Sequence, residues 1–228
     1  MGVHDGHRAR LRERYLKEGL DSFNEINTLE LLLFYAIPRR DTNEIAHALL
    51  DKFGSLDAVF NATHEDLCAV PGISDGTAVL LRLITDLQRK SILSRERPKI
   101  VSSTQEAGEY LAPYFIGRRD EAIYLLCLDA KGKVLDCRRL FEGTAHAVAI
   151  SVRKVVEAAM SSNASVVVLA HNHTSGLAFI SQEDISATRR IRSALDNLEI
   201  MLLDHLIFSE NDFISLAESG AMPTEDEK

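Results

Sequence analysis

Apolar residues between positions 8 and 92 recur at intervals of three and four, the spacing of one face of an amphipathic helix. The clearest run covers residues 28–37 and stops at Pro38, because proline cannot continue a helix. A last helix is expected over residues 76–91. Residues suited to capping precede the helices expected between these two: Asn43, Ser55 and Thr63. This pattern predicts an all-helical N-terminal domain over residues 1–95.

The pattern changes after a polar stretch at residues 94–99, where we place a domain boundary because no apolar periodicity crosses it. Beyond it, strands are expected at 121–129, 134–141, 165–170 and 200–208, and helices at 147–161 and 182–197. This order predicts a mixed α+β or α/β domain over residues 100–220, in which helices pack against a central sheet. Residues 221–228 form an acidic tail.

Composition is that of an ordinary globular protein. Hydrophobic residues make up 46% of the chain and charged residues 26%, so disorder is not expected. No apolar run approaches the roughly 18 residues of a membrane-spanning helix, and the N-terminal segment lacks the apolar core of a secretory signal. We therefore expect a cytoplasmic protein without membrane contact. The three cysteines show no Cys-x-x-Cys spacing, which argues against a disulfide framework or a cysteine zinc cluster.

The charge balance limits the role of nucleic acid. The net charge of the chain is −8, and its first 98 residues contain 13 basic and 15 acidic side chains, a balance of −2. Strong DNA-binding domains usually carry a basic excess. The only obvious basic patch is the run from His7 to Arg14, so any contact with nucleic acid must be local.

A group of metal-type ligands follows the strand expected at 165–170. His171 and His173 are two residues apart, so in an extended chain both imidazoles point the same way. Asp184 lies in the first turn of the next helix, and the intervening loop can bring its carboxylate back to the two rings. Two imidazoles and a carboxylate are a suitable three-ligand set for zinc, with water in the fourth position. Such a site can activate water for hydrolysis.

Hydrolysis also needs a group that takes a proton from water and returns it to the leaving group. A free carboxylate suits this task, and we favour Glu121, at the start of the first expected strand, over Glu183. A simpler interpretation also stands. Ser181 and Asp184 form a capping pattern, Asp184 could serve only as a helix-terminus charge, and the two histidines could be loop residues without a metal. Spacing alone leaves both interpretations open.

The spacing His-x-His, seven residues, Ser, two residues, Asp resembles the JAMM (MPN+) metalloprotease motif, and here it consists of His171, His173, Ser181 and Asp184. The surrounding sequence is similar to the RadC family of bacterial JAB-domain proteins, from about residue 6 to about residue 218. The segments that carry this similarity are 6–8, 29–40 and 70–73 in the first half, and 141–144, 171–176, 181–184 and 202–207 in the second.

The resemblance implies a JAB/MPN-like fold, a cytidine deaminase-like mixed β-sheet flanked by helices. It implies one zinc ion per chain, held by His171, His173 and Asp184. It also implies that Glu121 matches the upstream glutamate of the motif and that Ser181 hydrogen-bonds the developing oxyanion. Peptide or isopeptide hydrolysis is the activity of the wider superfamily, so the implied substrate is a peptide or protein.

Two departures from the family pattern lie between the histidines and Ser181. Thr174 stands where the family usually has proline. Residues 177–180 are apolar, where the loop is usually polar with a proline just before the serine. The ligands themselves are unchanged, so the departures concern the shape of the loop and its contacts with substrate.

Residues 66–81 resemble a helix-hairpin-helix, in which a glycine-rich hairpin presents backbone N–H groups to a DNA phosphate. The implied contacts are Gly72, Ser74 and Gly76, through which we expect weak DNA binding at most. Ser74 replaces the usual second glycine and would be strained if its φ were positive. The alternative is a plain turn between two packed helices.

Asp204 and His205 lie within an apolar strand, where they either orient a metal ligand from behind or form an ordinary buried polar pair. Three functions compete. The first is a JAMM-type zinc metallopeptidase, the second a DNA-repair or recombination accessory protein with a non-catalytic metal site, and the third a hydrolase acting on something other than a peptide. A catalytic zinc site leaves one position open to water, whereas four protein ligands close a structural one. The deaminase and HExxH signatures are absent from the sequence.

Overall fold

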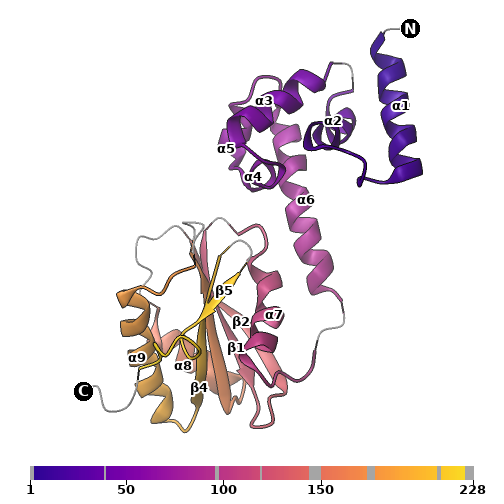
Figure 1. Cartoon of the computed structure of the whole chain (residues 1–228). Coiled ribbons are helices and arrows are strands. Elements are labelled where there is room, and N and C mark those ends of the chain that lie inside the picture. The colour runs from indigo at the N-terminus through magenta and orange to yellow at the C-terminus, as the bar shows by residue number, and fades with distance from the viewer. Residues whose placement is uncertain are drawn as a thin grey trace. The chain divides into compact units, whose positions relative to one another are not determined.

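The computed structural model of the chain is shown in Figure 1. It describes residues 3–38, 40–95, 98–118, 120–143, 150–173, 178–209 and 212–223. The chain divides into two compact units, Met1–Lys90 and Ser91–Lys228. The first unit is helical and the second contains the sheet. The predicted fold class, helices followed by a mixed sheet that helices flank, is therefore confirmed.

The N-terminal unit consists of helices packed around an apolar core. Its helices are α1 (Val3–Glu18), α2 (Glu25–Ala36), α3 (Asn43–Phe53), α4 (Leu56–Asn61), α5 (His64–Cys68) and α6 (Asp75–Leu93). Several leucines of this core have no exposed surface: Leu29, Leu33, Leu49, Leu67 and Leu81. They come from four different helices, so the periodicity that predicts the helices also supplies the core.

Two of the three predicted caps are present. Ser55 and Thr63 accept hydrogen bonds from the backbone N–H three residues on, at the starts of α4 and α5. The prediction that Asn43 caps α3 is wrong, because Thr42 occupies the cap position and its side chain makes no cap hydrogen bond. The Asn43 N–H donates instead to the Asp41 carboxylate at 2.9 Å, which satisfies one donor of the helix start.

The C-terminal unit is built on a five-stranded sheet with the order β2-β1-β3-β4-β5. The strands are β1 (Glu121–Leu128), β2 (Val134–Gly143), β3 (Val166–Asn172), β4 (Met201–Phe208) and β5 (Phe213–Ser215). β3 and β4 are parallel, and the other neighbouring pairs are antiparallel. The four predicted strands are confirmed. The strand that begins at Glu121 pairs with the buried strand that leads to the histidines.

Helices cover both faces of this sheet. α8 (Val152–Ser161) and α9 (Gln182–Asp196) pack on one face, and α7 (Thr104–Phe115) packs on the other (Figure 1). α9 lies where a helix was predicted, and part of the helix expected at 147–161 lies outside the described residues. The sequence pattern predicted neither α7 nor β5.

The central strands β1 and β3 are buried on both faces, which explains why their sequences are almost continuously apolar. Their side chains alternate between two cores. Leu125 and Leu169 pack under α8 and α9, whereas Leu126 and Val168 pack under α7. His171 follows Leu169 by two residues, so the first polar side chain at the end of β3 extends the face covered by α8 and α9.

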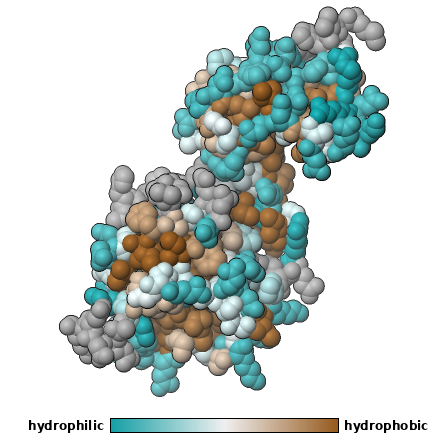
Figure 2. Space-filling model, viewed as in Figure 1, coloured by the Kyte–Doolittle hydropathy of each residue, from teal (hydrophilic) through white to brown (hydrophobic). Residues whose placement is uncertain are grey.

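Apolar surface is gathered in patches. Figure 2 shows hydrophilic residues over much of the visible surface of the helical unit and apolar patches on both units. On α6, Val79, Leu83 and Leu87 are 51%, 44% and 54% exposed, and their spacing of four places them on one side of the helix. No helix in the described part of the chain is long and apolar enough to cross a membrane.

Candidate metal centre

His171 and His173 lie at the carboxyl end of β3, with their ring centroids 4.8 Å apart. The strand is longer than predicted and includes both His171 and Asn172. The prediction that both histidines follow the strand is therefore wrong for His171, because pairing with β4 continues to residue 172. The His173 N–H still donates to the carbonyl of Phe208 at 3.0 Å, so the extended backbone keeps both imidazoles on one face.

Asp184 is held at the start of α9 by a capping box with Ser181. The Asp184 N–H donates to Ser181 Oγ at 3.1 Å, and the Ser181 N–H donates to Asp184 Oδ2 at 3.0 Å. The Ser181 hydroxyl also donates to Asp184 Oδ2, at 2.5 Å. The predicted capping arrangement is confirmed, and it fixes the carboxylate at the rigid start of a helix.

The structure brings His171, His173 and Asp184 together. His171 Nε2 lies 3.2 Å from Asp184 Oδ1, and His173 Nε2 lies 3.5 Å from Asp184 Oδ2. One ligand-type atom from each residue lies within 4.8 Å of the other two. His171 and Asp184 are 6% and 8% exposed, so little solvent reaches either side chain. Two imidazoles and a carboxylate match the donor chemistry of zinc.

The histidines favour the ionised form of the carboxylate. Burial raises the pKa of the Asp184 carboxyl, but hydrogen bonds and charge from His171 and His173, with the Ser181 hydroxyl, outweigh burial and hold that pKa well below its usual range. The ionised carboxylate is the form that binds a metal. Asp184 is therefore ionised at neutral pH, which is the form that a metal would require.

His205 reaches this cluster, whereas its neighbour Asp204 does not. His205 is fully buried, and its Nε2 lies 2.8 Å from His171 Nδ1. Burial holds the pKa of His205 well below its usual value, so the ring is neutral at physiological pH. Asp204 accepts hydrogen bonds from Thr104 of α7 and Ser215 of β5. The two residues are divided between the faces of the sheet because successive strand residues point to opposite sides.

Thr188 is a member of the site that the sequence analysis missed. Its hydroxyl donates to the backbone carbonyl of Asp184 at 2.6 Å and lies 2.6 Å from His205 Nδ1. The available signal was its position one helical turn after Asp184. That spacing becomes informative only once α9 is known to pack over β4, because the partner of Thr188 lies there.

Glu121 begins β1 and lies on the same face of the sheet as the cluster. Ile123 pairs with His171 in the antiparallel ladder between β1 and β3, and directly opposite residues share a face. Glu121 lies two residues before Ile123, so alternation places its side chain on the side of the histidines. Glu121 is half-buried, whereas Glu183, the rival base, is exposed.

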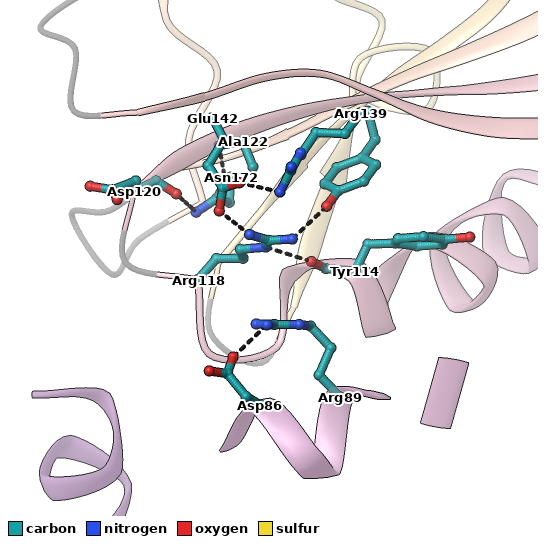
Figure 3. Close-up of polar contacts among 10 residues, drawn as sticks. Asp86, Arg89, Tyr114, Arg118, Asp120, Ala122, Arg139, Glu142 and Asn172 are labelled. Atoms are coloured by element: carbon teal, nitrogen blue, oxygen red, sulfur yellow. Dashed lines mark hydrogen bonds and ion pairs between the residues drawn. The ribbon is translucent and has the colours of Figure 1, made fainter. Parts of the chain in front are cut away.

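Asn172 binds the backbone on both sides of Glu121 (Figure 3). Its Oδ1 accepts a hydrogen bond from the Ala122 N–H at 2.8 Å, and its Nδ2 donates to the Asp120 carbonyl at 3.3 Å. Asn172 stands between the two histidines in the sequence, although the sequence analysis assigned it no role. The strand end that carries both imidazoles therefore also fixes the backbone that carries Glu121.

Arg118 ties the segment before β1 to its surroundings (Figure 3). Its guanidinium donates to the Tyr114 carbonyl at 3.2 Å and to the Tyr124 hydroxyl at 2.8 Å. It also pairs with Glu142 of β2, which in turn pairs with Arg139. These contacts fix the approach to β1, and so the start of the strand that carries the candidate base.

Phe179 packs against His173, with ring centroids 4.8 Å apart and an interplanar angle of 60°. Its side chain is 49% exposed. One residue of the unusual apolar loop thus contacts a candidate ligand while it is partly exposed to solvent. Thr174 and the rest of residues 174–177 lie outside the described ranges.

The hairpin of the N-terminal unit is shaped by Gly72. Its φ is +93°, and a Cβ there would lie 2.8 Å from the Ile45 side chain, so glycine is required. Ser74 does not have a positive φ, and the strain considered for it is absent. Its hydroxyl instead accepts a hydrogen bond from the Thr77 N–H at 3.3 Å. A Cβ added at Gly76 would meet no atom within 4 Å.

Three acidic residues lie close to this hairpin in the sequence. Asp75 is exposed and pairs with His64 at 2.9 Å. Glu65 and Asp66 are also exposed, in the first turn of α5. These charges oppose the approach of a phosphate, which agrees with the weak binding expected from the charge balance of this half.

Comparison with known proteins covers most of the chain. A family model described as a RadC-like JAB domain matches residues 101–221. A UPF0758 protein of Fusobacterium nucleatum is 33% identical over 224 residues, which is 94% of this chain and 96% of the relative. A UPF0758 protein of Vibrio cholerae is 36% identical over 210 residues, which is 92% of this chain and 94% of the relative. The region matched by the family model contains His171, His173, Asp184 and Glu121.

Proposed function

Because the chain belongs to the RadC-like JAB domain family, we propose that it is a zinc-dependent hydrolase of the JAMM type that cleaves a peptide or isopeptide bond. The observation that carries this proposal is the cluster of His171, His173 and Asp184, whose ligand-type atoms lie within 4.8 Å of one another. Three protein donors of these types are typical of a catalytic zinc site, which keeps one position for water. A purely structural site would be expected to have a fourth protein ligand.

A bound zinc ion would lower the pKa of water to about 7 and polarise the carbonyl of the scissile bond. The protein contributes the arrangement of donors. His171 and His173 offer imidazole nitrogens from the end of β3, and Asp184 offers a negative charge from the start of α9. Donors on a strand end and on a capped helix start are held more firmly than donors on a loop.

Glu121 is the proposed base. A carboxylate next to the attacking water takes its proton and returns it to the leaving amine, which typically contributes about 10²- to 10⁴-fold in rate. The position of Glu121 on the face of the histidines supports this role. The two hydrogen bonds between Asn172 and the flanking backbone support it further, because a base must be held in place to transfer a proton efficiently.

Ser181 is the proposed donor to the oxyanion that forms during hydrolysis. Its hydroxyl hydrogen is directed at Asp184 Oδ2, so this role requires the hydroxyl to rotate. The helix cap survives such a rotation, because the Asp184 N–H donates to a lone pair of Ser181 Oγ. One hydroxyl can therefore cap α9 and also stabilise the developing negative charge.

Elemental analysis tests the metal centre directly. The purified full chain is expected to contain about one zinc ion per chain. His173→Ala removes one of three donors and is expected to lose most of this zinc. His47→Ala, at an exposed histidine of α3, is the matched control and should retain it. An unchanged zinc content in the His173→Ala variant would contradict the site.

Activity tests the second half of the proposal. Cleavage of a set of fluorogenic peptides and isopeptide-linked substrates should stop when a chelator removes zinc and return when zinc is restored. Cleavage that is indifferent to chelation would separate hydrolysis from this metal centre.

We also propose that the hairpin at Gly72, Ser74 and Gly76 contacts DNA phosphates weakly, as an accessory protein of DNA repair or recombination would. The observation that favours this contact is the positive φ of Gly72, which shapes a tight hairpin before the N-terminus of α6. The acidic neighbours of the hairpin set the expectation of low affinity.

Titration of the full chain with duplex DNA should therefore give weak binding that falls steeply as salt rises. Ser74→Asp keeps a capping oxygen for α6 and adds a negative charge where the phosphate would lie, so binding should weaken further. Tight binding that ignores salt, or unchanged binding by the Ser74→Asp variant, would contradict a phosphate contact at this hairpin.

A further inference from the structure

A chain of buried hydrogen bonds runs from His171 through His205 and Thr188 to Asp184, which faces His171 across the candidate metal centre. His171 Nδ1 lies 2.8 Å from His205 Nε2, and His205 Nδ1 lies 2.6 Å from Thr188 Oγ1. Thr188 Oγ1 lies 2.6 Å from the backbone carbonyl oxygen of Asp184. Asp184 Oδ1 in turn lies 3.2 Å from His171 Nε2, so the chain closes into a ring.

The hydrogen atoms in this closed chain of contacts can be assigned one contact at a time, starting from the backbone carbonyl of Asp184. A carbonyl oxygen has no hydrogen, so the contact between Thr188 and Asp184 must use the single hydroxyl hydrogen of Thr188. The hydroxyl can then only accept at its other contact, which requires a hydrogen on His205 Nδ1. Both Thr188 and His205 are fully buried, so water does not replace either contact.

The same reasoning continues to His171. A fully buried imidazole is most stable in its neutral form, with one hydrogen. That hydrogen is on Nδ1 of His205, so its Nε2 carries a lone pair and must accept from His171 Nδ1. With this hydrogen fixed on Nδ1, Nε2 is the nitrogen through which His171 can bind a metal, and it is the atom that faces Asp184.

We propose that Thr188 and His205 are positioning residues that hold His171 in the Nδ1–H tautomer and so reserve its Nε2 for the metal. This inference rests on the proposed zinc site and names two residues outside the ligand set. Imidazole tautomers differ little in energy in water, and a partner for the distal nitrogen selects one of them. A partner behind a ligating histidine also fixes the ring orientation and raises the basicity of the ligand.

His173 provides a contrast within the same site. Its Nδ1 is buried and has no hydrogen-bond partner among the described residues. The fold therefore fixes the orientation of the His171 imidazole, which lies within β3. The His173 imidazole, which follows the strand, lacks an equivalent partner in the described part of the chain. We expect His171 to be the more firmly organised of the two ligands before the metal binds.

The hydrogen bonds from the Asp184 carbonyl through Thr188 and His205 to His171 are called the relay below. Zinc affinity of full-length variants, measured by competition with a chromophoric chelator, tests the relay. Thr188→Val keeps the shape of the side chain and removes the hydroxyl, so zinc affinity should fall by about 10- to 100-fold. Thr188→Ser restores the hydroxyl and should restore most of the affinity. Thr77→Val removes a buried hydrogen-bonded hydroxyl in the other unit and is the matched control, with affinity equal to wild type.

A spectroscopic readout separates the relay from a general loss of packing. Long-range ¹H–¹⁵N correlation spectra of the metal-free chain with ¹⁵N-labelled histidine report which ring nitrogen carries hydrogen. The wild type should show His205 and His171 protonated at Nδ1, and Thr188→Val should move the His205 hydrogen toward Nε2. Thr188→Ser should show the wild-type pattern.

A wild-type His205 protonated at Nε2 would overturn the relay, as would wild-type zinc affinity in the Thr188→Val variant. A wild-type chain that binds no zinc would instead contradict the proposed metal centre. In that case the tautomers of the metal-free protein still decide whether the hydrogen-bond chain exists as assigned.

Discussion

Glu121→Gln is expected to slow hydrolysis by about two to four orders of magnitude while leaving the zinc content unchanged. Glutamine has nearly the same size and keeps its place at the start of β1, but its neutral amide cannot take a proton from water. The measurement is kcat and zinc content in one preparation, with a peptide or isopeptide substrate that the wild type cleaves.

Glu183→Gln is the matched control for this variant. It makes the same chemical change at an exposed carboxylate next to Asp184 in the sequence, and its rate should equal that of the wild type. A larger loss from Glu183→Gln would mean that the base is misassigned although the zinc site could stand. Loss of zinc from Glu121→Gln would mean that Glu121 is itself a ligand.

Asp184→Asn is expected to reduce zinc affinity by more than about 100-fold, which is more than Thr188→Val or another substitution of a positioning residue should cause. The amide removes the negative charge that favours zinc on this residue. It keeps an oxygen that can accept from the Ser181 N–H, so the start of α9 should remain capped. Chelator competition measures the affinity, and urea unfolding of the metal-free variant measures the free energy of unfolding.

Ser181→Ala is the converse of that experiment. It removes the oxygen that accepts from the Asp184 N–H, which should cost about 1 kcal/mol of unfolding free energy. All three zinc donors remain, so zinc binding should be largely kept. Equal loss of zinc in both variants would show that the cap and the ligand cannot be separated, contrary to this expectation.

The sequence pattern was sufficient for elements whose apolar residues repeat regularly. The uninterrupted apolar run of β3 located a strand because that strand is buried on both faces. Ser55 and Thr63 located the starts of two short helices because their side-chain oxygens satisfy helix N–H groups. In each case the signal is local, since it depends on the chain within a few residues.

The pattern failed for α7 and β5 because each depends on the other. α7 contains Gly108 and Pro113, two residues that lower helix propensity. The structure shows the reason for the glycine: a Cβ at Gly108 would lie 2.2 Å from the ring of Phe213 in β5. The helix is weak in isolation because the strand needs the space, and β5 is too short to be recognised alone.

The candidate site divides in the same way. The spacing of His171, His173 and Asp184 predicted the three residues that the fold brings together, because a strand end and a capped helix start follow each other directly in the chain. Asn172 and Thr188 were missed because each contacts a strand that is distant in the sequence: Asn172 contacts the start of β1, and Thr188 contacts His205 in β4. Their contacts depend on the pairing of β1 with β3 and on the packing of α9 over β4. The spacing of nearby residues in the sequence predicts neither of these.

The candidate metal ligands and the candidate base lie on separate segments of the chain. His171, Asp184, Thr188 and His205 all belong to one continuous β3–α9–β4 segment, whereas Glu121 belongs to the hairpin of β1 and β2. A cut between β2 and α8 would leave every candidate ligand on one fragment and the candidate base on the other. During synthesis the Glu121 carboxylate emerges first, and it comes to the side of the candidate ligands only when β1 pairs with β3. On the proposed function, the capacity to hold a metal and the capacity to use it would therefore be acquired in separate steps of assembly.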